Sequence, residues 1–208
     1  MAVRVETLQV GMLQVNCYLV WAEEAGKALI IDPGGDACRI EQALNAAGLE
    51  PVGILLTHAH VDHISAVGAL TARFDLPVWV HADDCGLYLS PNNALPPWLP
   101  AASNLPPPAA ALPRAQGLAF DVIHTPGHTP GGVCYHFAAE SMLFSGDTLF
   151  QQSIGRTDLP GGNMGALLES IAQTLLVLPP ETRVLPGHGP ETTIGMEKSG
   201  NPYVSSRW

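Results

Sequence analysis

The chain has 208 residues, of which 47% are hydrophobic and 13% are charged. That length suits one domain with its own core, and so apolar a composition excludes a chain that is disordered throughout. Nine Lys and Arg against nineteen Asp and Glu give a formal net charge of −10. Nucleic-acid binders normally carry the opposite sign, so we expect no nucleic-acid partner, whereas a small anionic substrate held by local cations stays compatible with this charge.

The sequence also argues against a membrane-spanning or secreted protein. The longest stretch without charge, residues 85–113, contains eight prolines and three asparagines, which exclude a spanning helix. The first eleven residues lack the apolar core of a signal peptide, so we expect a cytoplasmic location. With no CxxC spacing, the four cysteines are expected to be small buried side chains in a reducing compartment: Cys17, Cys38, Cys85 and Cys134.

The first part of the chain alternates predicted strands and helices. Apolar segments bounded by Gly and charged turns predict strands at 3–10, 17–21, 28–31, 53–57 and 78–80. Asp36 is the expected N-cap of a first helix, and Gly48 its expected end. A second helix is predicted from the spacing of Val67, Leu70 and Phe74, which places these apolar side chains on one face.

A Pro-rich segment, residues 90–114, interrupts this alternation and predicts a long loop with little regular structure. Two interpretations stay open for it, a plain surface loop or a loop that roofs an active site. Further strands are predicted at 120–124, 132–137, 141–145 and 183–185, with a helix from about 165 that ends at Pro179. The chain therefore resolves into two similar halves, and residues 205–208 are expected to form a poorly ordered end.

Four metal-ligating side chains fall within six residues of the segment THAHVDH. His58 and His60 alternate along extended backbone and should point to the same side, while Asp62 and His63 follow as the chain turns into a helix. Such a density of ligands where a strand ends has no structural purpose. The segment therefore predicts a metal site.

Three further candidate ligands, His128, Asp147 and His188, lie in glycine-bearing turns downstream. Together with the first four they make five imidazoles and two carboxylates without a thiolate, which is typical of zinc, iron or manganese in an open catalytic site. Seven ligands are too many for one tetrahedral zinc. They suit two metals about 3.5–4 Å apart, with one bridging carboxylate.

The remaining histidines lack this setting and are expected to be ordinary core or surface residues: His81, His124 and His136. His124 lies on a predicted strand that leads to the site, so an outer partner of a ligating histidine is the alternative interpretation for it.

These motifs resemble the metallo-β-lactamase-fold superfamily, and within it the glyoxalase II group (hydroxyacylglutathione hydrolases) in its short form without the C-terminal helical domain. The resemblance covers nearly the whole chain through the segments IDPG, THAHVDH, TPGHTPG, FSGDTLF, IGRTDLPGG and LPGHGPETTIGMEKSGNPY. It implies an α/β fold, a four-layer αββα sandwich, in a single domain over residues 1–208.

The resemblance also assigns the ligands to two divalent ions, with zinc favoured and iron or manganese as alternatives. His58, His60 and His128 would hold one ion, Asp62, His63 and His188 the other, and Asp147 would bridge them. Asp62 and Asp147 are the carboxylates given a catalytic role. A hydroxide between the ions would attack the thioester carbonyl of an S-acylglutathione such as S-lactoylglutathione, releasing lactate and glutathione.

Arg156, in the segment GRTD, is the candidate contact for a substrate carboxylate, because glyoxalase II enzymes carry a lysine there and guanidinium binds carboxylate through two hydrogen bonds. The alternative is an internal tie between Arg156 and Asp158 that shapes the loop. The expected partner is a small thioester, with no membrane or nucleic acid, and the chain is expected to be a monomer or small homo-oligomer.

The main alternative function within the fold is a persulfide dioxygenase, which shares the GRTD motif. That resemblance would place a single ferrous ion on His58, His128 and Asp147, a two-His, one-carboxylate set with open positions for oxygen. A β-lactamase is disfavoured by the absence of a secretion signal and by the tail motif, the segment TTIGMEKSGNPY near the C-terminus. A nuclease is disfavoured by the negative charge.

Overall fold

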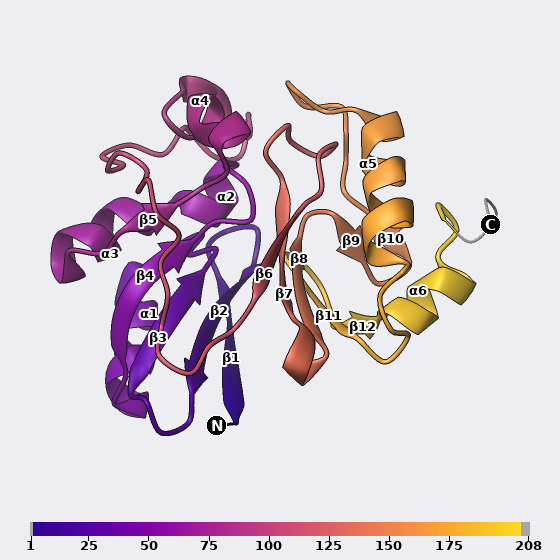
Figure 1. Ribbon diagram of the computed structural model, residues 1–208. Helices are drawn as coiled ribbons and strands as arrows, with labels where there is room; N and C mark the ends of the chain where they lie inside the picture. The colour runs from indigo at the N-terminus through magenta and orange to yellow at the C-terminus, as the bar shows by residue number, and fades with distance from the viewer. Residues whose placement is uncertain (1, 205–208) are drawn as a thin grey trace. The chain divides into compact units, whose positions relative to one another are not determined.

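The computed structural model describes residues 2–204 and divides into two compact units. Of the described residues, the first unit comprises 2–80 and 85–118, and the second comprises 81–84 and 119–204. Each unit contains a five-stranded sheet with helices on it (Figure 1), so each unit has the composition of one half of an αββα sandwich. The two halves predicted from the sequence are thus confirmed as separate structural units.

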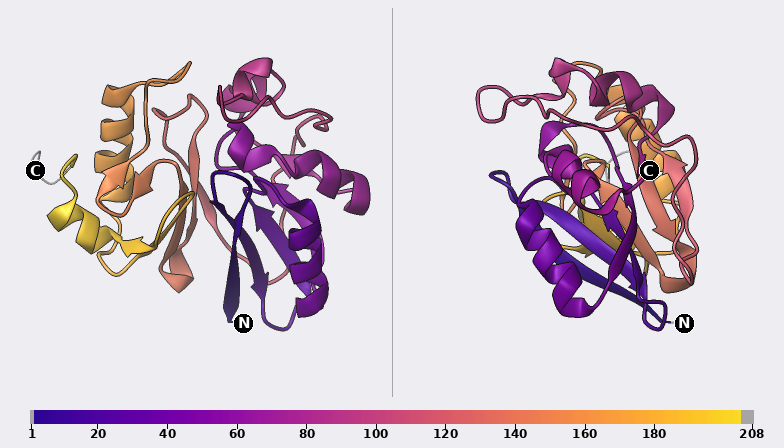
Figure 2. Two further views of the ribbon diagram at one scale, coloured as in Figure 1. Left: turned by 180° about the vertical axis from the view of Figure 1, so that it is seen from behind. Right: turned by 90° about the vertical axis from the view of Figure 1, so that its left-hand side faces the viewer.

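The first sheet has the strand order β1-β2-β3-β4-β5. Its strands are Val3–Val10, Val15–Ala22, Lys27–Ile31, Glu50–Leu55 and Val78–Trp79. The pairs β1–β2 and β2–β3 are antiparallel, whereas the pairs β3–β4 and β4–β5 are parallel. Figure 2 shows the helices α1 (Ala37–Ala47) and α3 (Val67–Phe74) on one face of this sheet. The apolar side chains of Ile40, Leu44 and Leu70 are buried between these helices and the sheet.

The parallel pairing of β3 with β4 determines where the polar segments of this unit emerge. Ile31, the last residue of β3, lies opposite Leu55, the last residue of β4. Because parallel strands place their carboxyl ends at the same edge, Asp32 and the segment from Thr57 to His63 follow the two strands at one edge. A short helix, α2 (Val61–Ile64), begins within that segment.

The Pro-rich segment 90–114 contains one short 3₁₀ turn, η2 (Pro91–Asn93), and an isolated bridge between Leu95 and Leu99, and is otherwise irregular as predicted. It follows α4 (Cys85–Tyr88) and packs on the first unit. Ala109 donates a backbone hydrogen bond to Val78, and Pro113 lies against Gly53 of β4. The end of the segment therefore contacts strands β4 and β5 of its own unit, whereas a roof over an active site stays a prediction.

The second sheet has the strand order β12-β11-β8-β7-β6. In chain order its strands are β6 (Asp121–His124), β7 (Val133–Phe137), β8 (Met142–Gly146), β11 (Arg183–Pro186) and β12 (Thr192–Thr193). Only the β8–β11 pair is parallel, and a separate hairpin is formed by β9 (Leu149–Phe150) and β10 (Ser153–Ile154). Helices α5 (Met164–Ser170) and α6 (Ile194–Gly200) lie on the same side of this sheet in Figure 1.

Short 3₁₀ turns, η1 (Ala82–Asp84) and η3 (Ala138–Glu140), complete this unit. Helix α5 continues into one π-helical turn, η4 (Ile171–Leu175), so the helix predicted from about 165 is present but irregular in its second half. The tail is held by Glu197, which is 1% exposed and accepts hydrogen bonds from Gln152, Thr192 and Asn201. These contacts give the tail motif a packing role.

Three expectations from the sequence need correction or restriction. Asp36 precedes α1 but its side chain makes no cap; it adopts a left-handed conformation and accepts a hydrogen bond from the Gly11 N–H. Cys38 is exposed rather than buried, because it lies on the outward face of α1. The predicted disordered end, residues 205–208, lies outside the described residues. Within residues 2–204, the helices are too short and polar to cross a bilayer.

Candidate metal centre

The first unit brings four of the seven predicted ligands together. The rings of His58 and His60 meet edge to face, with their centroids 4.9 Å apart, and His58 lies 4.1 Å from His63 by the same measure. The Nε2 atom of His63 is 3.7 Å from Oδ2 of Asp62. All four residues are at most 6% exposed. Strand β4 ends at Leu55, so His58 and His60 lie beyond the strand rather than on it, with His60 in extended conformation.

A buried carboxylate, Asp32, orients two of these histidines. It accepts hydrogen bonds from the backbone N–H of Thr57 at 2.7 Å, from the Thr57 hydroxyl at 2.6 Å and from His63 Nδ1 at 3.0 Å. Because an ionised carboxylate only accepts, His63 carries its proton on Nδ1 and presents the lone pair of Nε2. The metal-binding form of the imidazole is therefore set by Asp32.

The same network reaches His58 through Thr57. The Thr57 hydroxyl proton is given to Asp32, so its oxygen can only accept from His58 Nδ1, which lies 3.1 Å away. His58 thus also presents the lone pair of Nε2. Asp32 and Thr57 were not assigned a role from the sequence, although the segment IDPG was noted; the parallel register of β3 and β4 is the signal that unites them.

The backbone around these ligands is closely packed. A Cβ atom at Gly34 would lie 1.5 Å from the carbonyl oxygen of Asp62. Any side chain there would therefore displace the backbone of a candidate ligand, which explains why glycine follows the Asp32-Pro33 pair.

The second unit brings together the other three predicted ligands. Asp147 Oδ2 lies 3.7 Å from His128 Nε2 and 3.8 Å from His188 Nε2. One carboxylate oxygen thus lies within 4 Å of a nitrogen from each of two histidines. Asp147 and His188 are partly exposed, whereas His128 is buried. The residues come from three turns, which follow β6, β8 and β11.

His128 is oriented in the same way as the histidines of the first unit. Its Nδ1 lies 2.7 Å from the backbone carbonyl oxygen of Arg156, and a carbonyl can only accept. The Nδ1 atom therefore carries the proton and Nε2 faces Asp147 with its lone pair. Gly155, the residue before Arg156, permits the close approach of this loop to both ligands, because a Cβ atom there would lie 1.9 Å from the carbonyl oxygen of Asp147 and 3.3 Å from Cβ of His128.

The guanidinium of Arg156 is engaged by a neighbour in its own loop. Its Nε and one terminal nitrogen bond the two oxygens of Asp158 at 2.8 and 2.7 Å. This hydrogen-bonded pair lowers the pKa of the Asp158 carboxyl to about 2 and raises that of Arg156. The internal tie is thus present, and the predicted contact of Arg156 with a substrate stays a prediction.

The chemistry of the donor set fits divalent metal ions. Three of the histidines present Nε2 lone pairs that are fixed by acceptors at Nδ1, as metal-ligating histidines generally are. The carboxylates of Asp62 and Asp147 stand beside such nitrogens in their respective units. Imidazole and carboxylate ligands without thiolates suit zinc, iron or manganese.

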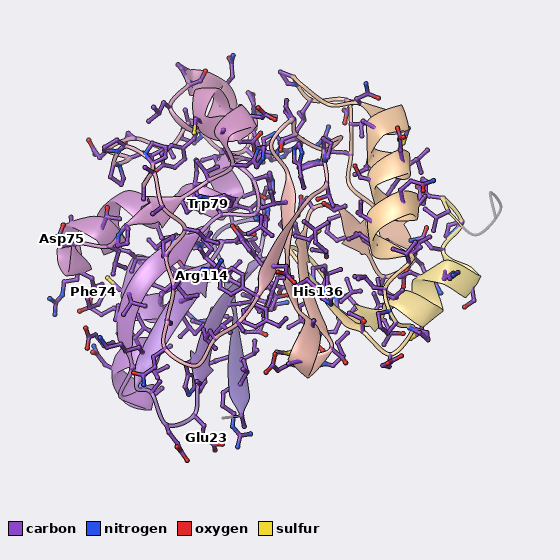
Figure 3. All side chains as sticks on the ribbon, viewed as in Figure 1. Glu23, Phe74, Asp75, Trp79, Arg114 and His136 are labelled. Atoms are coloured by element: carbon purple, nitrogen blue, oxygen red, sulfur yellow. The ribbon has the colours of Figure 1, made fainter. Side chains whose placement is uncertain are left out.

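The histidines outside the predicted site have two different settings. His136 lies on β7 (labelled in Figure 3), opposite Asp121 of β6, and burial lowers the pKa of its imidazole. His81 and His124 instead stack on each other, with ring centroids 4.2 Å apart, and both lie near Asp83. His124 is therefore part of a second cluster, which the sequence did not indicate because its members lie 43 positions apart.

A comparison with known families identifies the fold. Residues 10–188 match the model of the metallo-beta-lactamase superfamily, over a range that includes residues of both units. The chain therefore belongs to the metallo-β-lactamase superfamily and has its fold. The assignment of residues 1–208 to one domain stays a prediction.

Two relatives align over nearly their whole length. The chain is 39% identical over 204 residues to the probable metallo-hydrolase YqgX of Bacillus subtilis, covering 95% of this chain and 96% of that protein. It is 37% identical over 210 residues to the hydroxyacylglutathione hydrolase GloC of Haemophilus influenzae, covering 98% and 99% of the two chains. The chain is thus a homologue of metallo-hydrolases that include a glyoxalase II.

Three solved structures that are similar to the chain differ in the names of their activities or in the metals they bind. The B3 metallo-beta-lactamase BLEG-1 matches with a TM-score of 0.86 and 41% identity, over 97% of this chain and all of that one. A di-iron-bound form of TTHA1623 has a TM-score of 0.80 and 41% identity, over 96% and 100%. ETHE1 from Myxococcus xanthus has a TM-score of 0.81 and 30% identity, over 99% and 86%.

Proposed function

We propose that the two ligand groups form one binuclear metal centre and that the protein hydrolyses the thioester of an S-acylglutathione. The observation that carries the proposal is the similarity to GloC across almost the full length of both chains. All seven positions that the family resemblance assigns to ligands hold a histidine or an aspartate. Asp147, which lies near two Nε2 atoms in its own unit, is the proposed bridging carboxylate.

The residues of the chain prepare the ligands before a metal binds. Divalent ions held by this set would supply a hydroxide near neutral pH and polarise the thioester carbonyl. Asp32 keeps the protons of His58 and His63 on Nδ1, directly or through Thr57, and the Arg156 carbonyl does the same for His128. No proton has to move within these three rings when an ion binds.

Arg156 is the proposed contact for a carboxylate of glutathione. The side chain is about half exposed and its partner Asp158 is 67% exposed, so an incoming carboxylate can exchange with Asp158 in water. Exposed ion pairs of this kind contribute little to stability because solvent screens them, so the exchange is readily made.

A persulfide dioxygenase is the second candidate, because ETHE1, a close structural neighbour of the chain, is a persulfide dioxygenase. This activity would need His58, His128 and Asp147 with a single iron. It would not need His188, which therefore separates the two proposals.

The deciding experiment compares three substrates on the same purified protein, loaded with either zinc or iron. Zinc-loaded protein is assayed for thiol release from S-lactoylglutathione and for opening of a chromogenic cephalosporin, and iron-loaded protein is assayed for oxygen uptake with glutathione persulfide. We expect thiol release to dominate and to be lost in His188→Ala but kept in His136→Ala. Oxygen uptake that survives His188→Ala, without thiol release, would establish the dioxygenase instead, and dominant cephalosporin opening would also overturn the proposal.

A further inference from the structure

A second group of metal-ligating side chains lies entirely within the second unit. His81, Asp83 and His124 each offer one ligand atom, and these atoms lie within 4.8 Å of one another. His81 Nδ1 is 3.7 Å, and His124 Nε2 is 3.9 Å, from the same oxygen of Asp83, Oδ2. None of the three belongs to the seven candidate ligands described above.

The two segments that carry these residues are fixed to each other. The turn η1 is held by Asp84, which is fully buried and accepts hydrogen bonds from the Thr129 hydroxyl at 2.8 Å and the Gly131 N–H at 2.6 Å. Residues 129 and 131 lie in the turn after β6, the strand that ends at His124. A Cβ atom at Gly131 would lie 2.5 Å from the backbone nitrogen of Asp84, so glycine is needed for this approach.

This anchoring holds His81 and Asp83 close to His124. The segment His81–Asp84 packs with the second unit although the chain before and after it belongs to the first. The rings of His81 and His124 are stacked with an angle of 15° between their planes. Both imidazoles are therefore held on the same side of Asp83 before any ion arrives.

We propose that His81, Asp83 and His124 form a separate surface site that binds one divalent transition-metal ion, of the class of Zn²⁺. Two imidazoles and one carboxylate are ligands that this class prefers. Ligands about 2.0–2.1 Å from a tetrahedral ion lie about 3.4 Å apart, so rotations of exposed side chains suffice to close the observed distances. Asp83 is 58% and His124 41% exposed, which leaves the remaining positions to water.

The hydrogen bonds at the site define what the ion must replace. His81 Nδ1 accepts from the backbone N–H of Asp83 at 3.3 Å, so this nitrogen carries no proton, and an ion bound to it replaces that hydrogen bond. His124 Nε2 lies 2.9 Å from the carbonyl oxygen of Pro130 and donates to it. An ion bound at this nitrogen takes the place of that hydrogen bond, and the ring proton moves to Nδ1, so the imidazole binds in its neutral form. The ion would link η1 to the end of β6.

The test counts ions in the full-length protein. Wild type, His81→Ala, Asp83→Asn, His124→Ala and the control His136→Ala are dialysed against buffered Zn²⁺ at rising free concentration, and bound zinc is measured by mass spectrometry. His136 lies on the neighbouring strand, outside the group. We expect each of the three site variants to bind one zinc ion fewer per chain than wild type and His136→Ala, with affinity at the site at least about tenfold weaker.

Thermal melting checks that the variants are folded. Asp83→Asn keeps the size of an exposed side chain, so it tests the site even where an alanine variant is unstable. Addition of Zn²⁺ should raise the Tm of wild type and His136→Ala more than that of Asp83→Asn. Equal zinc content in wild type, Asp83→Asn and His124→Ala would overturn the proposal.

Discussion

The substitution Asp32→Asn changes how the ligating histidines are oriented and protonated, while every candidate ligand stays the same residue. Asparagine tolerates the left-handed conformation of residue 32, where φ is 50°, and it keeps one oxygen that can accept the Thr57 N–H. Its NH₂ group replaces the oxygen that accepts from both the Thr57 hydroxyl and His63. His63 must then accept at Nδ1, which moves its proton to Nε2, the atom that should bind metal.

The expected effect on metal binding follows from that proton. Loss of an outer partner of a ligating histidine typically lowers metal affinity by about 10–100-fold, or about 1.4–2.7 kcal/mol. The metal-free protein should lose only about 1–3 kcal/mol of its free energy of unfolding, because Thr57 and His63 can reverse their hydrogen bonds towards the amide.

The assay is competition for zinc with a chromogenic chelator, alongside urea denaturation of the metal-free protein. Asp36→Asn is the matched control, since Asp36 lies in the same loop, also has a positive φ, and bonds the Gly11 N–H on the surface. Wild-type zinc affinity in Asp32→Asn would refute the assignment of tautomers, and so would an equal loss in Asp36→Asn.

Three further outcomes are expected. Asp147→Asn should lower zinc content and abolish thioester hydrolysis, because the amide cannot bridge two ions as a carboxylate does; normal turnover would refute the bridging role. Arg156→Ala should raise KM for S-lactoylglutathione more than it lowers kcat, and Asp158→Ala should lower KM by freeing the guanidinium; a fall in kcat alone would place Arg156 in transition-state stabilisation. Gly34→Ala should cost about 1–3 kcal/mol in urea denaturation, because its Cβ would meet a carbonyl oxygen at 1.5 Å, whereas Gly86→Ala, with open space around it, should be neutral.

The sequence predicted most strands and the candidate ligands because both leave local patterns. The segment THAHVDH concentrates ligands in a way that no core requires, and glycine-bearing turns mark His128, Asp147 and His188. Helix α1 was located by its apolar spacing and by Gly48, which adopts the left-handed conformation at the helix end. Asp36 fits the N-cap composition as well, yet its side chain bonds Gly11, 25 residues earlier, instead of the helix.

Contacts between distant segments could not be predicted in this way. Asp32 acquires its role from the parallel pairing of β3 with β4, which places it beside Thr57. The group of His81, Asp83 and His124 exists only because Asp84 fixes η1 to the turn after β6. Each of these residues looks ordinary in its local sequence.

The most direct test of a binuclear hydrolase is a zinc titration of the metal-free protein while thiol release from S-lactoylglutathione is followed. The titration is made in His124→Ala, so that the proposed surface site does not add to the count. We expect activity to rise to a plateau at two zinc ions per chain, with the second ion needed for most of the activity. A plateau at one ion per chain, or turnover without metal, would contradict a binuclear hydrolase.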